Sequence, residues 1–195
     1  MKETLLTVLE NTRLADGIYR LRLAGDTSAI TAPGQFVNLK LSGFFLRRPI
    51  SVCDWENGEV TLIYKVLGHG TEAMTGMAVG TALDVLTGLG NGFDLSRSGE
   101  HPLLVGGGVG IPPLYGLAKR LTAQGKRVTA VLGFNRKSEF FFSGGISGAG
   151  CGGRHRHRRW QRRSQGPCDR RHGRRVRLYL SLHLRPGADA QGGVR

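Results

Sequence analysis

Alternating apolar and polar positions divide the first hundred residues into short segments separated by turn-forming residues. The segments span residues 5–9, 18–23, 35–41 and 60–66, and the turns span residues 15–17, 32–34 and 56–58. Period-two alternation is typical of strands with one face in water, and Gly, Pro, Asn and Asp favour the turns. Short, regularly spaced strands predict a β-barrel over residues 1–97. Residues 71–77 interrupt it as a predicted short helix with Thr71 as its N-cap.

A different pattern begins after residue 97. A short apolar strand, Leu103-Leu104-Val105, runs into a glycine turn, and a helix then opens with proline. One face of that helix is apolar at i, i+3, i+4 and i+7, the positions of Leu114, Leu117, Ala118 and Leu121. Gly125 ends the helix, and residues 127–134 form the next apolar strand. This order predicts the start of a doubly wound α/β domain over residues 98–142.

The glycine turn itself predicts a dinucleotide site. Glycine lets the backbone approach a phosphate or a nicotinamide closely, and the turn supplies Gly106, Gly107, Gly108 and Gly110. The spacing departs from GxGxxG, because Gly108 and Gly110 fit the first two positions but Pro113 stands at the third.

Two further segments offer anion-binding chemistry. Arg47-Arg48-Pro49-Ile50-Ser51 places a planar guanidinium and a hydroxyl beside a proline, which suits a strand edge or a turn. Gly68-His69-Gly70-Thr71 opens the short helix, where free N–H groups can bind an anion. Taken alone, the first segment fits a solvated arginine pair better, and the second fits a simple turn better. His69 is expected to be an exposed residue of that turn.

Charge divides the chain in a second way. The 195 residues carry a formal net charge of +14, although residues 1–142 hold 15 Lys and Arg against 12 Asp and Glu. Residues 143–195 hold 13 Arg, no Lys and 2 acidic residues, with 11 of the 31 Gly. Three interpretations fit this segment: a tail that binds nucleic-acid phosphates, a disordered solubilising tail, and a coding sequence translated out of frame.

The genetic code supports the third interpretation. GC-rich codons chosen for residues 183–195, moved forward by one base, encode Thr-Cys-Gly-Pro-Glu-Pro-Met-Leu-Lys-Ala-Val. The same shift permits an amphipathic helix from Ser143, and a buried strand with a turn from Cys151. One shift restores a helix, a strand and a motif in that order. We therefore expect residues 143–195 to be an out-of-frame, disordered Arg/Gly-rich tail.

Several function classes find no support. Cys53, Cys151 and Cys168 are too few and too widely spaced for a disulfide framework or a CxxC metal site. No nucleophile–base set stands out in residues 1–142. The N-terminus has no secretory signal pattern and the chain has no run of about 18 apolar residues, which predicts a cytoplasmic protein without a membrane partner.

The order RRPISV, IYK, GHGT and VGGGVGIPPL resembles the ferredoxin–NADP reductase superfamily. The stretch LLVGGGVGIPPLYGLAKRL…GKRVTAVLGFNRKSE is similar to the electron-transfer subunits of type B dihydroorotate dehydrogenases. The resemblance covers residues 1 to about 140. It implies an antiparallel Greek-key FAD-binding barrel, followed by a Rossmann-like nicotinamide domain that is incomplete in this chain. The gamma subunits of related hydrogenase and NAD(P)H:ferredoxin complexes are the alternative within the superfamily.

The resemblance also implies roles for individual residues. Arg48, Pro49, Ile50 and Ser51 would line FAD, with Arg48 at the pyrophosphate. Ile63, Tyr64 and Lys65 would contact the cofactor along its length, and Gly70 and Thr71 would meet its phosphates. Gly106 to Gly110 would admit NAD(H).

In that family, electrons pass from dihydroorotate, oxidised at FMN in a catalytic partner, through a [2Fe–2S] centre to FAD and NAD⁺, in pyrimidine biosynthesis. The implied assembly is two plus two subunits, with no nucleic acid. The cysteines for the [2Fe–2S] centre, four thiolates, are absent here. We therefore expect this chain to bind FAD weakly and to be inactive in electron relay.

Overall fold

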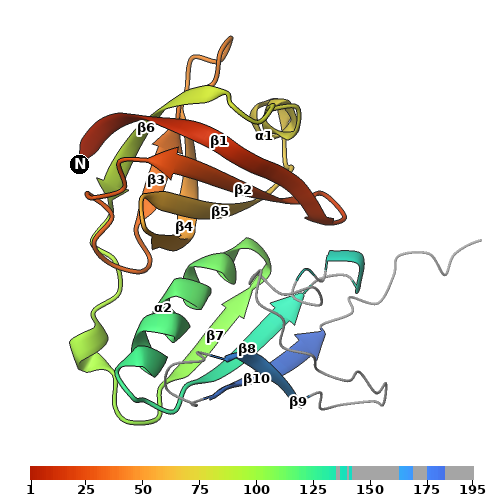
Figure 1. Ribbon diagram of the computed structural model, residues 1–195. Coiled ribbons are helices and arrows are strands. Elements are labelled where there is room, and N and C mark those ends of the chain that lie inside the picture. The colour runs from red at the N-terminus through yellow and green to blue at the C-terminus, as the bar shows by residue number, and fades with distance from the viewer. Residues whose placement is uncertain (135–136, 140, 142–162, 169–174, 183–195) are drawn as a thin grey trace, which may run out of the picture.

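The computed structural model describes residues 1–134, 137–139, 141, 163–168 and 175–182, which form a closed barrel and a four-stranded sheet (Figure 1). The barrel strands are β1 (Lys2–Ala15), β2 (Ile18–Gly25), β3 (Phe36–Leu39), β4 (Arg48–Glu56), β5 (Glu59–Lys65) and β6 (Ala82–Leu89). Their order is β1-β2-β5-β4-β3-β6, and all neighbours are antiparallel. The predicted antiparallel barrel is therefore confirmed.

The barrel has two strands that the alternation did not predict. In β4 the pattern is broken by Pro49 and by a register shift between Val52 and Asp54. In β6 the apolar–polar alternation is weakened by Asp84 and Gly88. Leu83, Val85 and Thr87 are nevertheless buried at every second position, as a strand requires.

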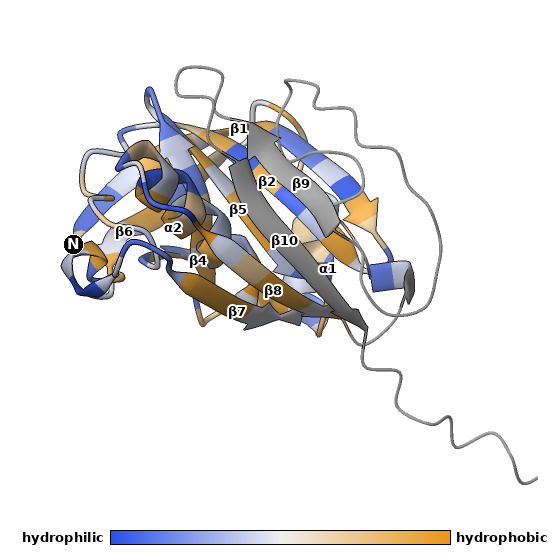
Figure 2. Cartoon of the chain, turned by 90° about the horizontal axis from the view of Figure 1, so that it is seen from below, coloured by the Kyte–Doolittle hydropathy of each residue, from blue (hydrophilic) through white to orange (hydrophobic). Residues whose placement is uncertain are grey.

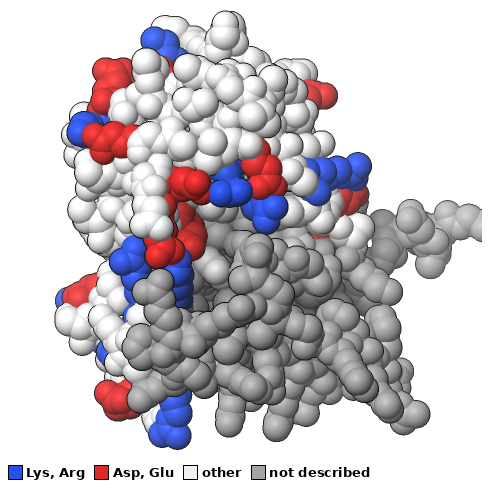
Figure 3. All heavy atoms as spheres, in the orientation of Figure 1, with Lys and Arg blue, Asp and Glu red and all other residues white. Residues whose placement is uncertain are grey.

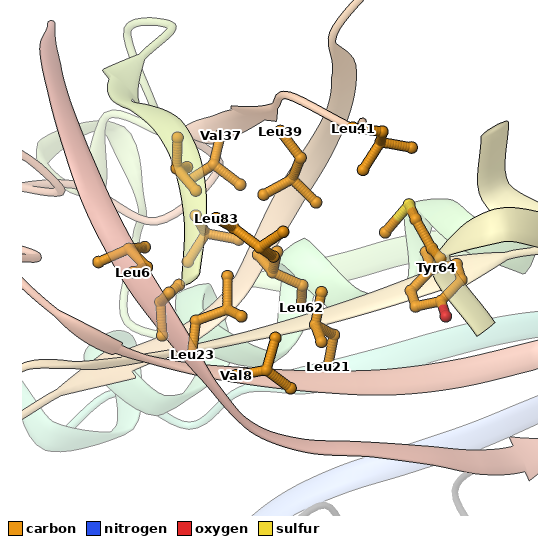
Figure 4. Packing of buried hydrophobic residues seen from close by; sticks show 14 of the residues in the cluster. Leu6, Val8, Leu21, Leu23, Val37, Leu39, Leu41, Leu62, Tyr64 and Leu83 are labelled. Atoms are coloured by element: carbon orange, nitrogen blue, oxygen red, sulfur yellow. The ribbon is translucent and has the colours of Figure 1, made fainter. Parts of the chain in front are cut away.

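Buried aliphatic side chains fill the barrel interior, with Tyr64 at one end of the packed group (Figure 4). They come from all six strands because every second residue points inward. Leu21, Leu23, Leu62 and Val60 are fully buried in this core. The six strands close into one barrel.

The second part begins with the predicted strand–helix–strand unit. It contains η1 (Leu95–Arg97), β7 (Leu103–Gly107), η2 (Gly108–Gly110), α2 (Pro112–Ala123), β8 (Thr129–Phe134) and η3 (Lys137–Glu139). β7 and β8 are parallel, as a crossover helix requires. α2 lies between this sheet and the barrel (Figure 1), where Ile18 and Ile63 share a buried cluster with Leu117 and Leu121.

Two strands lie in the segment expected to be disordered. They are β9 (Arg163–Cys168) and β10 (Arg175–Leu182). β10 pairs in parallel with β8 and antiparallel with β9, giving the sheet order β7-β8-β10-β9. The remainder of residues 143–195 lies outside the described residues, so the expected disorder of that remainder stays a prediction.

Candidate functional site

The candidate site lies where β4 and β5 diverge. The two strands pair from Val52 opposite Leu62 to Glu56 opposite Glu59. Beyond Val52 and Leu62 the described ladder contains no pairing between 48–51 and 63–65, and each segment pairs only with its outer neighbour, β3 or β2. We call residues 48–51 and 63–65 the β4–β5 fork. It contains the seven residues that the sequence singled out on these two strands.

Pro49 explains part of this divergence. It lies opposite Asn38 of β3, on a stretch of β4 that has no partner on the β5 side. Because proline has no N–H, it cannot contribute to a ladder there. The expectation of a strand-edge position is thus met locally, although β4 as a whole is flanked by two strands.

Arg48 and Gly70, far apart in sequence, are in contact at the open end of the fork. A Cβ built on Gly70 would overlap Nε of Arg48 and lie 2.5 Å from its Cζ and Nη2. Nη1 of Arg48 donates to the carbonyl of Leu46 at 2.6 Å, and the guanidinium lies 5.0 Å from the Phe44 ring centroid. These contacts hold the guanidinium against the start of α1 (His69–Thr75), the end of a helix at which the first N–H groups have no carbonyl partner within the helix.

Thr71 is not the N-cap of that helix, contrary to the prediction. Gly68 holds the N-cap position and Thr71 is the third helical residue. The Thr71 hydroxyl reaches back and accepts from the N–H groups of Leu67 and Gly68, at 2.9 and 3.2 Å. This is the reciprocal half of a capping box, performed by threonine. His69 is exposed, as expected, in the first turn of the helix.

The neighbouring Arg47 has a structural role instead. Its guanidinium binds the Asp84 carboxylate of β6 through two bonds, at 2.9 and 3.0 Å, and Glu3 of β1 at 2.8 Å. These bonds hold the pKa of Asp84 below its usual range. Of the two arginines, Arg48 is therefore the one whose recorded contacts include no carboxylate among the described residues.

The side chains of 63–65 are already engaged by the protein. Ile63 packs into the cluster under α2, and Tyr64 is 2% exposed in the barrel core. The Tyr64 hydroxyl donates to Oδ1 of Asn11 at 3.2 Å, and burial raises the pKa of Tyr64. Lys65 forms an ion pair with Glu139 at 2.8 Å. At this side of the fork, the backbone is the surface that a ligand can contact.

Asn11 is a site-supporting residue that the sequence did not indicate. Its Nδ2 donates to the carbonyl of Met74 at 2.8 Å while its Oδ1 accepts from Tyr64. Asn11 of β1 therefore links helix α1 to the barrel. A single asparagine in an alternating strand carries no signal of such a role.

Of the predicted glycine turn, Gly106 and Gly107 belong to the end of β7, and Gly108–Gly110 form η2, which contacts β5. Gly108 has φ +52°, a left-handed conformation that glycine adopts without strain. A Cβ on Gly106 would come 2.5 Å from the Leu114 side chain, so glycine lets α2 start close to the sheet. A Cβ on Gly107 would meet only ordinary contact, and one on Gly110 would point into open space.

No cluster of three or more His, Cys, Asp or Glu side chains suited to a metal occurs in the described part of the chain. Cys53 is buried under α2, and burial raises the pKa of its thiol. The described residues therefore do not fit a cluster that needs four thiolates. Among the same residues, no helix is long and apolar enough to span a membrane.

Solved structures share this barrel with its appended α/β part. A cytochrome P450 reductase from Amycolatopsis aligns with a TM-score of 0.66 and 24% identity over 73% of this chain and 46% of its own. An NADH-dependent reduced ferredoxin-NADP oxidoreductase aligns with a TM-score of 0.65 and 31% identity over 72% and 52%. A ferredoxin NADP⁺ reductase from Neisseria gonorrhoeae, solved with bound FAD and NADP, aligns with a TM-score of 0.63 and 18% identity. The chain therefore has the fold of the ferredoxin reductase-like flavoproteins.

Curated relatives make the relationship more specific. The chain is 45% identical over 150 residues to the dihydroorotate dehydrogenase B (NAD(+)) electron transfer subunit of Bacillus pumilus, covering 73% of this chain and 58% of that protein. It is 42% identical over 144 residues to the subunit of Fusobacterium nucleatum, covering 70% and 56%. Over the matched residues the chain is homologous to the electron transfer subunits of dihydroorotate dehydrogenase B. It spans a little over half of their length, and no family model matches the sequence.

Proposed function

We propose that the β4–β5 fork is an FAD site and that the chain is the flavin-binding part of an electron-transfer subunit. The observation that carries this proposal is the Arg48 guanidinium seated over Gly70 at the start of α1. A guanidinium held beside the N-terminus of a helix suits a pyrophosphate, which offers several charged oxygens at once. Thr71, as the third residue of α1, would meet the same phosphates.

The unpaired backbone of the fork supplies the rest of the proposed site. Backbone N–H and C=O groups of 63–65 have no ladder partner on the β4 side, so a flavin ring edge would satisfy them. Ile50 and the Ser51 hydroxyl would contact the cofactor from β4. FAD, when bound, supplies the hydride and one-electron chemistry, and the protein positions it.

The nicotinamide cofactor is proposed to bind at the glycine turn. Gly106, Gly107, Gly108 and Gly110 keep side chains away from this turn, and η2 contacts β5. A nicotinamide ring bound there would lie on the same side of β5 as the fork. The relatives' name favours NAD over NADP.

The relatives' name also supplies the proposed physiological reaction. Dihydroorotate would be oxidised in a catalytic partner subunit, and its two electrons would reach NAD⁺ through the flavin, as a step of pyrimidine biosynthesis. The proposed assembly contains two copies of each subunit. The [2Fe–2S] centre of the family is not assigned to this chain, whose three cysteines fall short of four ligands.

We further propose that residues 143–195 are translated out of frame and that this chain is inactive in relay. The abrupt rise in arginine after residue 142, and a match covering only 73% of the chain, support this. Resequencing the DNA around codons 140–145 tests it. A missing or extra base is the expected result, and a clean read in the present frame would contradict it.

FAD binding can be tested on the whole chain. We expect the purified protein, titrated with FAD, to quench flavin fluorescence, and Arg48→Ala to weaken that quenching at least tenfold. Arg13→Ala is the matched control, because Arg13 is an exposed arginine of β1 that pairs with Asp16. Equal FAD affinity in the three proteins would overturn the assignment of Arg48.

A further inference from the structure

Helix α2 approaches the end of β4 unusually closely. A Cβ built on Gly116 would lie 2.8 Å from the backbone carbonyl oxygen of Cys53. Such a distance is shorter than side-chain contacts normally reach, so glycine is needed for this approach. The contact is buried, because Cys53 and Ile18 of the barrel share one apolar cluster with Leu117 and Leu121 of α2.

Charged side chains reinforce this contact. Lys119 Nζ of α2 donates to Asp54 Oδ2 at 2.8 Å and to Glu56 Oε2 at 2.9 Å, both on β4. Burial opposes the charge of Lys119, but these two hydrogen bonds raise its pKa overall, so it stays an ammonium. The Arg120 guanidinium lies 4.1 Å from the Trp55 ring centroid. Charged residues accordingly gather where the barrel meets the α/β part (Figure 3).

A second connection lies at the far end of the α/β unit. Directly after β8, the carbonyl of Ser138 accepts from the N–H of Asp16 at 3.1 Å, in the β1–β2 turn. Glu139 forms its ion pair with Lys65 of β5, and both side chains are largely buried. The strand–helix–strand unit is thus joined to the barrel before and after β8.

Each element of the α2–β4 contact also carries one proposed binding segment. β4 holds residues 48–51 at its start and Cys53–Glu56 at its end. α2 begins directly after the glycine turn and presents Gly116, Lys119 and Arg120 to β4. Because a strand and a helix are stiff, this contact limits how far the start of β4 and the start of α2 can move apart.

We propose that Gly116 and Lys119 are positioning residues that hold the glycine turn at a fixed distance from the fork. The inference rests on the proposed function for its meaning, since it makes the nicotinamide turn and the flavin site one rigid unit. It requires the barrel and α2 to open together, so that a ligand bound to the barrel alone also stabilises α2.

Hydrogen exchange of the whole chain in increasing urea tests the coupling without a ligand. As urea increases, we expect the amides of the barrel core and of residues 117–122 to reach the same free energy of opening, which indicates one shared opening reaction. In Lys119→Met/Arg120→Gln the α2 amides should exchange at lower urea while the barrel amides stay unchanged. The single variant Lys119→Arg should keep the wild-type convergence, since a guanidinium can bind both carboxylates. Lys126→Met is the matched control, because Lys126 bonds Ser98 outside this contact.

Adding FAD separates this inference from the proposed function. At about 100 times its dissociation constant, a ligand slows exchange through a shared opening roughly 100-fold. We expect that slowing in both the barrel and α2 of the wild type, and in the barrel alone of the double variant. Barrel amides that ignore FAD would overturn the FAD site, while the urea series still tests the coupling. Wild-type α2 amides that open separately in urea would overturn the positioning role.

Gly116→Ala provides an independent variant with a small change in side chain. Its new Cβ must displace either α2 or the Cys53 carbonyl. We expect it to separate the two openings as the double variant does, with the barrel still folded. Convergence retained in both variants would show that neither residue sets the contact.

Discussion

Replacing Gly70 with alanine places a methyl group in the space that the Arg48 guanidinium occupies. The new Cβ would lie 2.5 Å from Cζ and Nη2 of Arg48, well inside contact distance, so the arginine must leave its position over α1. The arginine side chain is flexible, so the helix need not move. Alanine also favours a helix by about 1 kcal/mol over glycine. The apo protein should therefore unfold at an unchanged or slightly higher temperature.

FAD binding at the proposed site should respond very differently. A hydrogen bond to a charged group contributes about 1.5–3 kcal/mol. Losing the guanidinium from the phosphates should then weaken FAD binding roughly 10- to 100-fold. The assay is fluorescence titration with FAD, beside a circular-dichroism melt of the apo protein. Gly68→Ala is the matched control, because nothing lies within 4 Å of its Cβ. If Gly70→Ala and Gly68→Ala bind FAD equally well, the reasoning from Arg48 is wrong.

Other predictions concern the fold around the site. Tyr64→Phe removes the hydrogen bond from the tyrosine hydroxyl to Asn11, so the free energy of unfolding measured in urea should fall by about 1 kcal/mol. An unchanged FAD affinity in this variant would confirm that the hydroxyl stabilises the barrel. Because Arg47 lowers the pKa of Asp84 below 3.8, the carboxylate stabilises the fold above about pH 4 and loses this effect as the pH falls further. Asp84→Asn should therefore show a smaller drop in urea midpoint on acidification, and an unchanged drop would contradict the pairing. Cys53 is buried with a raised pKa, so peptide mapping after iodoacetamide should find it unmodified in the native protein and alkylated in urea. If Cys53 of the folded protein reacted as fast as an exposed thiol, the result would show that α2 does not cover Cys53.

The barrel was predictable because its inward positions alternate with outward ones in most strands. β4 escaped prediction since Pro49 and the register shift beside Cys53 break its period, and Pro49 lies in the fork itself. The fork itself arises from pairing that stops at Val52 and Leu62. Pairing between distant strands leaves no local pattern that sequence periodicity can detect.

The site residues show the same division between local and tertiary information. The glycine turn was predictable in part because its backbone chemistry is local, but Gly106 and Gly107 pair with β8 as the end of β7. Thr71 was misplaced by three residues, since a threonine before an apolar run suits both the N-cap and the third helical position. The sequence could not separate Arg47 from Arg48. That difference is set by Asp84 and Glu3, which folding brings to Arg47 from other strands.

The two halves of the molecule also differ in how they would behave in a crowded solution. The six barrel strands form a closed ring, whereas β7 is an outermost strand of the described four-stranded sheet and pairs only with β8. Its Leu103 and Val105 side chains are 61% and 69% exposed, and β7 and β8 present apolar residues in Figure 2. An apolar run of this kind is typical of a parallel strand covered on both faces. Self-association at high concentration should therefore start at β7 and leave the barrel intact. Charged residues at positions 103 and 105 would make the chain more soluble without touching the proposed flavin site.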